Sequence, residues 1–302
     1  MRFSVWPSLM QPVGEVLEVA AHADRTGWDG VYVADHFMGD GGGFGPAEAP
    51  TLEATAVLAA LATATSRVRL GPLVLSTTYR HPAVLAKWAA TVDHLSGGRL
   101  VLGVGAGWQQ NEHDQYGIAL PGRRDRVDRF DESCTVLNAL LRHGRTTFDG
   151  RWFHLDDALC EPKPLQDPLP LLVGGKGDRM LGVVARHADE WNLWGLPPWI
   201  ADRSAVLARR CEEAGRDPDG IRRSTQALIL PTDDDAAARG FLARVAPRAA
   251  VAGPWSLIVD TVGEWAAAGV DELIVPDTPL GRGAERREQL DGFLAAVGGF
   301  RR

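Results

Sequence analysis

The sequence predicts an α/β fold, built as one (β/α)8 barrel over residues 1–302. Short apolar or β-branched runs alternate with longer segments in which apolar residues recur at helical spacing. Eight such runs occur, and 302 residues are enough for one barrel-sized domain. The predicted strands are Arg2–Trp6, Gly30–Ala34, Val68–Ser76, Leu100–Gly105, Leu169–Val173, Glu190–Trp194, Ser224–Leu230 and Glu272–Pro276.

The predicted helices lie between these strands. The first helix places Val16, Ala20 and Ala23 on one face. We expect it to end at Gly27, because glycine adopts the left-handed helix cap most easily. The predicted helices are Val13–Thr26, Thr51–Thr65, Ala83–Leu95, Arg123–His143, Met180–His187, Ile200–Ala214 and Val259–Ala267.

Two connections are longer than a minimal barrel needs, and we expect insertion loops there. The segment Gly39–Pro46 is so rich in glycine that we expect a mobile lid bordering the active site. In the segment Thr146–Phe153, the pair Asp149-Gly150 lies between strand-like flanks, which predicts a type I′ hairpin. The prolines of 161–168 favour an extended, non-helical chain after this hairpin.

The composition favours a protein that acts on a small molecule in a reducing cytoplasm. A chain with 45% hydrophobic and 24% charged residues is typical of folded globular proteins. Its net charge of -7 provides no general attraction for nucleic acid. No apolar run is long enough to cross a membrane. Cys134, Cys160 and Cys211 are too few for a disulfide framework and lack the spacing of a zinc site.

Polar residues follow several predicted strands, at the positions that line the catalytic mouth of a barrel. Asp35 and His36 follow the second strand, Ser76 and Thr77 lie at the end of the third, and 105–108 follow the fourth. His36 can exchange a proton near neutral pH. The alternative, a histidine that only bonds the loop backbone, has about equal weight. His36 is therefore the candidate catalytic residue, with Asp35 beside it.

Two glycine-rich turns also follow strands, and neither matches a nucleotide-binding motif. The segment Gly103–Trp108 lacks the last glycine of a dinucleotide fingerprint and the βαβ unit around it. The segment Gly174–Gly177 lacks the spacing and the terminal Ser or Thr of a P-loop. Because this second turn leads into the helix Met180–His187, its backbone N–H groups form a candidate phosphate site. The alternative is a tight turn without a ligand.

Missing motifs disfavour several enzyme classes. The chain has no H-E-x-x-H, no histidine pair at metal-ligand spacing and no G-x-S-x-G elbow, so zinc and serine hydrolases are disfavoured and no metal is expected. Lys176 is the only lysine near a predicted strand end. Schiff-base aldolase chemistry is therefore a weak alternative.

The strand ends carry a series of motifs in a fixed order. They are Gly27–Phe37 with Asp35-His36-Phe37, Thr65–Gly71, Arg80–Ala83, Asp93–Trp108 with Gly105-Ala106-Gly107-Trp108, Asn111-Glu112, Pro170–Gly175 and Ala188–Asn192. In order and spacing they resemble the luciferase-like monooxygenase superfamily, whose members use reduced FMN or the deazaflavin coenzyme F420. The resemblance covers most of the first 195 residues, and the last 100 fit only as the completion of the barrel.

This resemblance implies a TIM barrel of the bacterial-luciferase type, with the cofactor ring across the ends of the early strands. It implies a non-prolyl cis peptide near Leu73-Val74, behind the ring. The residues implied at the ring are Asp35, His36, Val74, Ser76, Thr77, Ala106, Gly107 and Asn111, and those implied at the phosphate are Gly174, Gly175 and Gly177.

The endings after the second and fourth strands look more like the F420 branch than the FMN luciferases. Relatives that oxidise glucose 6-phosphate place a glutamate where this chain has Trp108. Trp108, together with Trp191 and Trp194, therefore predicts a more apolar substrate pocket. Core packing is the alternative for these three tryptophans.

These inferences predict an oxidoreductase that transfers a hydride between F420 and an organic substrate, with His36 and Asp35 as catalytic residues. One alternative is a monooxygenase that uses reduced FMN, and another is a barrel that binds a ligand without catalysis. The resemblance also implies that the chain can form a homodimer.

Overall fold

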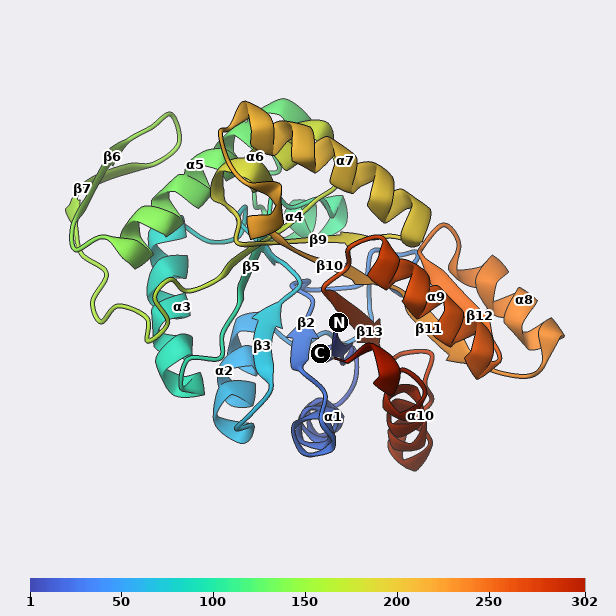
Figure 1. The fold of residues 1–302 in the computed structure, drawn as a ribbon. Coiled ribbons are helices and arrows are strands. Elements are labelled where there is room, and N and C mark those ends of the chain that lie inside the picture. Colours follow the sequence, from blue (N-terminus) through green and yellow to red (C-terminus); the bar gives the residue numbers. More distant parts are fainter. Residues whose placement is uncertain (302) are drawn as a thin grey trace.

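The computed structural model describes residues 1–301, which form a barrel of parallel strands surrounded by helices (Figure 1). The sheet order is β3-β2-β1-β13-β10-β9-β8-β5-β4. Its two end strands, β3 and β4, come from one stretch of chain, so the sheet closes on itself. The strands are β1 Arg2–Trp6, β2 Gly30–Val33, β3 Arg69–Pro72, β4 Leu75–Ser76, β5 Leu102–Gly105, β8 Leu171–Gly174, β9 Glu190–Trp194, β10 Arg222–Gln226 and β13 Glu272–Pro276.

Between β3 and β4 lies a non-prolyl cis peptide, Leu73-Val74, as expected. Before this peptide, Leu70 of β3 forms a parallel bridge with Leu100. The predicted strand Val68–Ser76 is therefore one strand position of the barrel, divided into β3 and β4 by an interruption at 73–74. The predicted barrel is confirmed.

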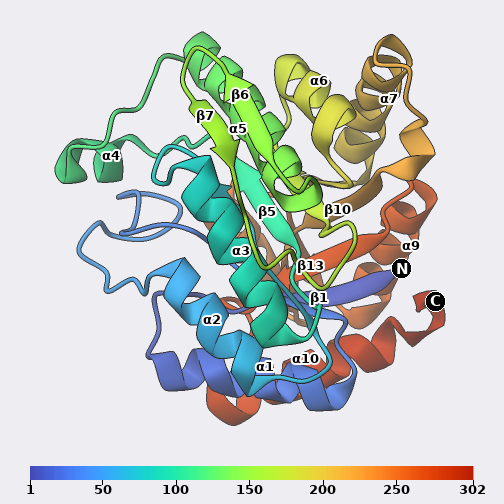
Figure 2. The ribbon, with the colours of Figure 1, turned by 90° about the vertical axis from the view of Figure 1, so that its left-hand side faces the viewer.

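Helices cover the outside of the barrel and connect successive strands. Figure 2 shows the two chain termini on one side of the molecule, with α4 and the loop after β2 on the opposite side. Within residues 1–301, no helix has both the length and the apolar character to cross a membrane. The helices around the barrel are α1 Val13–Thr26, α2 Ala54–Ala64, α3 Pro82–Ser96, α5 Arg123–Arg142, α6 Asp178–His187, α7 Pro197–Glu213, α9 Trp255–Ala267 and α10 Gly283–Ala296.

Elements with a strong local pattern occur where the sequence predicts them. Helix α1 has its predicted bounds and ends at Gly27, whose φ of 99° is left-handed. The predicted strand Ser224–Leu230 is wrong, because the chain divides there into β10 and β11 Leu228–Pro231. Strand β11 pairs with β12 Ala250–Gly253 in a separate parallel pair. Three helices were not predicted: α4 Gln110–Tyr116, α8 Asp235–Val245 and α10.

The insertion after α5 is a hairpin of β6 Thr146–Asp149 and β7 His154–Ala158, as predicted. Its turn is not the predicted type I′, because Asp149 pairs with His154 across a four-residue loop and Gly150 has no positive φ. Instead, the Glu132 carboxylate accepts hydrogen bonds from the backbone N–H groups of 151 and 152. A side chain of α5 therefore shapes this turn.

The end of the barrel where the strands begin is closed by a buried charged cluster. Arg69, Glu190 and Glu272 are the first residues of β3, β9 and β13. Arg69 pairs with both carboxylates, at 3.0 Å from Glu272. Burial raises the pKa of Glu272 despite this partner. This end of the barrel is therefore filled by side chains.

Candidate active site

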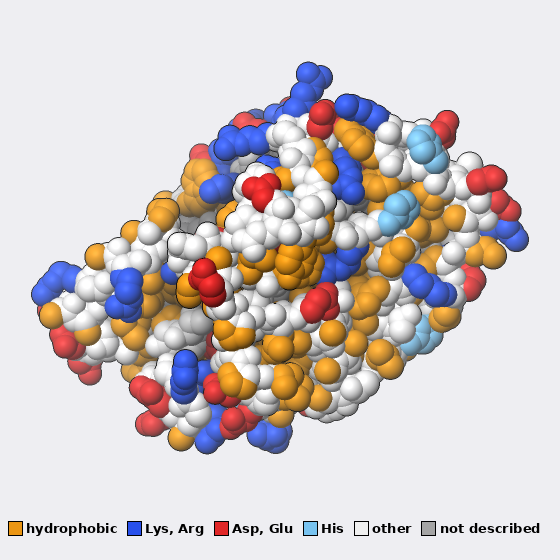
Figure 3. Space-filling model, turned by 180° about the vertical axis from the view of Figure 1, so that it is seen from behind, with side chains coloured by type: hydrophobic (Ala, Val, Ile, Leu, Met, Phe, Trp, Pro, Cys, Tyr) orange, Lys and Arg blue, Asp and Glu red, His pale blue; other side chains and the backbone are white. Residues whose placement is uncertain are grey.

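Two adjoining cavities open at the carboxyl ends of the strands, with volumes of about 570 Å³ and 410 Å³. Both fall within the range of ligand-binding pockets. Figure 3 views the molecule from this side, where apolar and basic side chains lie next to each other. The residues that line both cavities are Trp6, Ala34, His36, Phe44 and Trp194.

Most of the predicted site residues line the larger cavity. They come from different strand ends, which the barrel brings together as its geometry requires. These residues are Asp35, His36, Val74, Ser76, Ala106, Gly107, Trp108, Gly174, Gly175, Gly177 and Trp194.

Three predicted site residues do not line either cavity, because their polar atoms face the surrounding backbone. The hydroxyl of Thr77 donates to the carbonyl of Gly105. The amide of Asn111 donates to the carbonyl of Gly39 at 2.8 Å. Trp191 is fully buried, and its indole N–H donates to the carbonyl of Gly175 at 2.7 Å. Trp191 thus belongs to the core, and the expectation that it lines the substrate pocket is wrong.

His36 lies in the wall that the two cavities share. Its Nδ1 is 2.9 Å from Oε1 of Glu112. Its other nitrogen, Nε2, has no protein partner within residues 1–301. The rings of Phe44 and Trp108 pack against the imidazole, with centroids 5.7 and 5.4 Å away. One nitrogen is therefore fixed by the protein, and the other is available to a ligand.

Glu112 is the functional residue that the sequence analysis missed. It is fully buried in α4, where it also accepts hydrogen bonds from the hydroxyl of Tyr79 and the backbone N–H of Phe37. Burial alone would raise the pKa of Glu112, but the hydrogen bonds from His36 and Tyr79 outweigh it and lower that pKa. The motif Asn111-Glu112 was the only sequence signal that pointed to Glu112. It indicated neither the helix α4 nor the contact with His36.

Asp35 does not orient His36. Both of its carboxylate oxygens accept hydrogen bonds from Arg80, at 2.7 and 2.9 Å, and one also accepts from the N–H of Ser76. Arg80 in turn pairs with Glu53 at the start of α2. Asp35 therefore connects three segments of the mouth, and Glu112 is the carboxylate on the imidazole.

The glycine turn 174–177 leads directly into α6, as predicted. Gly177 is the N-terminal cap residue, and no atom lies within 4 Å of a Cβ placed there. The first-turn N–H groups of α6 have no acceptor within the helix, so they can bind an anion. The N–H of Gly175 is not among them, because it donates to the carbonyl of Asn192 at 3.0 Å.

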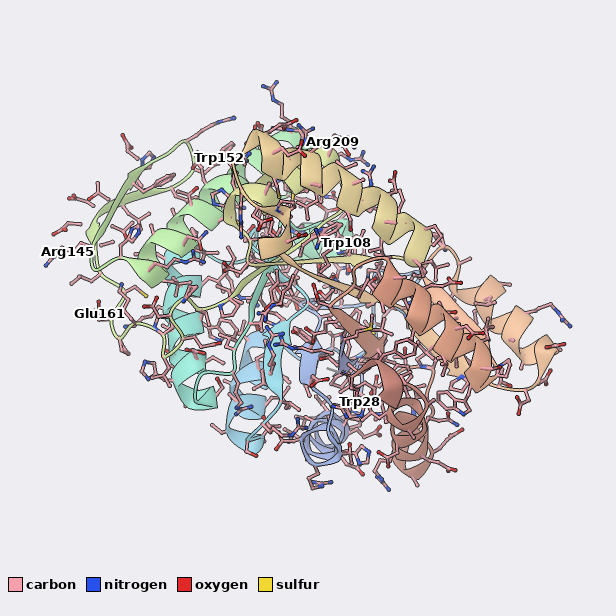
Figure 4. The ribbon with its side chains drawn as sticks, in the orientation of Figure 1. Trp28, Trp108, Arg145, Trp152, Glu161 and Arg209 are labelled. Atoms are coloured by element: carbon pink, nitrogen blue, oxygen red, sulfur yellow. The ribbon has the colours of Figure 1, made fainter. Side chains whose placement is uncertain are left out.

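The tryptophans divide between pocket and core. Trp108 is 52% exposed and lines the larger cavity, and Figure 4 shows it well apart from Trp28, which lies between α1 and α10. Trp194 packs on Trp6 with ring centroids 5.6 Å apart. Trp108 and Trp194 therefore provide aromatic surface to the cavities.

Comparisons with known proteins identify the family of this chain. The family model described as luciferase-like monooxygenase matches residues 1–272. An F420-dependent glucose-6-phosphate dehydrogenase of Nakamurella multipartita is 35% identical over 213 residues, which are 68% of this chain and 60% of that protein. The pyrimidine monooxygenase RutA of Cronobacter sakazakii is 32% identical over 195 residues, or 62% of this chain and 56% of that protein.

A solved structure shows the same fold over its full length. It is an F420-dependent secondary alcohol dehydrogenase in complex with an F420-acetone adduct, with a TM-score of 0.86, 21% identity and 98% coverage of both chains. The two curated relatives are matched over only 60% and 56% of their own length. Because the family model matches most of the sequence and the barrel places the expected strand ends around one cavity, this chain belongs to the luciferase-like monooxygenase family.

Proposed function

We propose that the protein is an oxidoreductase that transfers a hydride between F420 and an organic substrate. The observation that supports this most is His36, which lines both cavities and has one free nitrogen. Relatives named as F420-dependent enzymes support the choice of cofactor. Asp35, by contrast, has a positioning role, because Arg80 occupies both of its oxygens.

The larger cavity fits a flat ring that carries an anionic side chain. Val74, Ala106 and Leu193 contribute apolar surface, and the glycine turn 174–177 contributes backbone donors beside α6. Three basic side chains complete this lining: Arg123, Arg126 and Lys176. When bound there, F420 would supply the centre that accepts or donates the hydride.

The protein's own contribution is to hold and move a proton at Nε2 of His36. Hydride transfer at a carbon that bears oxygen requires a proton to leave or reach that oxygen. The buried carboxylate of Glu112 fixes the orientation of the imidazole through the hydrogen bond at Nδ1. Phe44 and Trp108 cover the ring and exclude water from it.

The smaller cavity is the proposed substrate pocket. Trp6, Leu9, Phe44 and Trp194 make much of its surface apolar, which favours an organic substrate with an apolar body. Sugar-phosphate oxidation is disfavoured, because Trp108 replaces the glutamate of relatives with that activity.

The alternative is a monooxygenase that activates oxygen with reduced FMN, and a relative named as a monooxygenase supports it. Titration of the purified protein with F420 and FMN, each oxidised and reduced, separates the two. Binding of F420 and substrate-linked F420 reduction or oxidation are expected. Tight binding of FMN with substrate-linked oxygen uptake would instead establish the alternative. A barrel that binds cofactor but turns over no substrate would support the non-catalytic reading.

A further inference from the structure

Three basic side chains at the rim of the larger cavity have no acidic partner. Arg123 and Lys176 are exposed, and Arg126 is half-buried between them and the cavity lining. None of the three forms an ion pair with a carboxylate within residues 1–301. On a chain with a net charge of -7, this is a local concentration of positive charge.

The carboxylates nearest to this rim in sequence are bound to other arginines. The two acidic residues of the cavity lining itself, Asp35 and Glu112, are also occupied, by Arg80 and His36. The rim charges therefore have no counter-ion of their own. The neighbouring pairs are Asp125 with Arg151, Asp128 with Arg179, and Asp178 with Arg203.

The position of the two arginines is also unfavourable for the helix that carries them. Arg123 and Arg126 lie in the first turn of α5, a helix of 20 residues, where the helix dipole disfavours cations. Their three-residue spacing places them on one face. Burial, followed by the charge of Arg123, lowers the pKa of Arg126. An anion bound at this rim would offset both the unfavourable helix dipole and the repulsion between Arg123 and Arg126.

We propose that Arg123, Arg126 and Lys176 bind the acidic tail that F420 carries beyond its phosphate, so that cofactor affinity rises with the number of tail carboxylates. This inference rests on the proposed function. F420 continues past the phosphate into a chain of glutamates, whereas FMN ends at the phosphate. The glycine turn beside α6 would hold the phosphate, and the three cations lie on the same cavity lining, at its solvent-exposed rim.

The test compares the dissociation constants of F420 forms with no glutamate and with several glutamates, by fluorescence titration at low and high salt. For the unmodified protein we expect the long-tailed form to bind roughly tenfold more tightly at low salt, a difference that shrinks at high salt. In the double variant Arg123→Gln/Arg126→Gln, the two forms should bind within about twofold of each other. The glutamate-free form should bind this variant almost as it binds the unmodified protein.

Arg25→Gln is the matched control, because Arg25 ends α1 at the opposite side of the barrel and has no ion-pair partner within residues 1–301. It should leave the tail-length dependence unchanged. Arg123→Glu, on the exposed rim, lowers the charge of the rim as much as the double variant does, so it should likewise bring the two forms within about twofold and provides a second, independent variant. Equal affinity of the unmodified protein for all tail lengths would overturn this inference and leave the proposed function intact. Failure of every F420 form to bind would overturn both.

Discussion

Single residues at the mouth have roles that follow from which of their atoms are already bonded. His36 has one nitrogen on Glu112 and the other free, whereas Asp35 has both oxygens on Arg80. A group with a free atom at a cavity wall can react, and a group without one can only hold its neighbours. We therefore assign proton transfer to His36 alone.

Replacement of His36 tests this assignment directly. In His36→Ala, turnover should fall by roughly 10²-fold or more, the usual contribution of a general acid or base, while cofactor affinity changes little. Asp35→Asn should affect affinity and turnover together and less strongly. Single-turnover hydride transfer at saturating cofactor is the measurement, and a near-normal rate in the alanine variant would refute the catalytic role.

Glu112→Gln tests the carboxylate behind the imidazole. The neutral amide holds Nδ1 of His36 less firmly than the carboxylate does, so turnover should fall by roughly tenfold while the KM for the substrate changes little. The lowered pKa of Glu112 keeps its carboxylate charged at neutral pH.

Glu53→Gln is the control, because Glu53 pairs with Arg80 and has no contact with His36. It should leave turnover within about twofold of the unmodified protein. A loss of activity in Glu112→Gln that only follows the loss of folded protein in urea denaturation would mean that Glu112 only stabilises the fold.

At the scale of elements, the loop 39–45 borders the site, because Gly43, Phe44 and Gly45 line the smaller cavity. The carboxylate of Asp40 accepts hydrogen bonds from the N–H groups of Gly42 and Phe44, at 2.8 and 2.9 Å, which shapes the loop and brings Phe44 to His36. Its mobility stays a prediction. If the loop orders over bound ligand, proteinase K should cut it in the free protein and be blocked by cofactor and substrate together.

Two glycines of this loop offer a matched pair of variants. A Cβ at Gly39 would collide with the carbonyl oxygens of Gly45 and Pro46, whereas at Gly42 the nearest atom is 3.7 Å away. Gly39→Ala should therefore be cut faster and lose protection by ligands, and Gly42→Ala should behave like the unmodified protein. The cut sites are identified by mass spectrometry. Identical cutting of both variants, with and without ligand, would mean that this loop takes no part in ligand binding.

At the scale of the whole molecule, the charged cluster at the closed end of the barrel joins strands that are distant in sequence. In Arg69→Met, the buried carboxylates of Glu190 and Glu272 lose their partner, and the free energy of unfolding should fall by about 3–5 kcal/mol near pH 8. Urea denaturation monitored by tryptophan fluorescence measures this loss.

The loss should be smaller at pH 5 than at pH 8. Burial raises the pKa of Glu272 above its ordinary value, so the folded state binds this proton more readily than the unfolded state. Without Arg69, protonation of Glu272 at low pH therefore stabilises the fold, and this stabilisation is lost as the pH rises through the raised pKa.

Arg222→Met is the control. Arg222 is 44% exposed and contacts Glu190 alone in this cluster, so its replacement should lower the free energy of unfolding by about 1 kcal/mol or less. An equal loss at both pH values for Arg69→Met would contradict this account.

The sequence by itself determined the barrel fold and the end of the barrel at which the site residues gather. Helix α1 and strands β1, β9 and β13 have their predicted bounds, because apolar periodicity reports locally which face of an element is buried. The rule that strand ends line the mouth correctly brought together residues from 35 to 194 in one cavity.

Only the tertiary structure decided which side chains meet. Glu112 reaches His36 across 76 positions of sequence, Arg80 occupies Asp35, and Trp191 turns into the core. Periodicity gives a side chain its face, but a hydrogen-bond partner depends on loop paths and distances that no local pattern encodes. The same holds for the glycine turn 174–177, which the sequence predicted. Only the folded chain shows that the N–H of Gly175 is bonded to the carbonyl of Asn192, and that Arg123 and Arg126 have no acidic partner within residues 1–301.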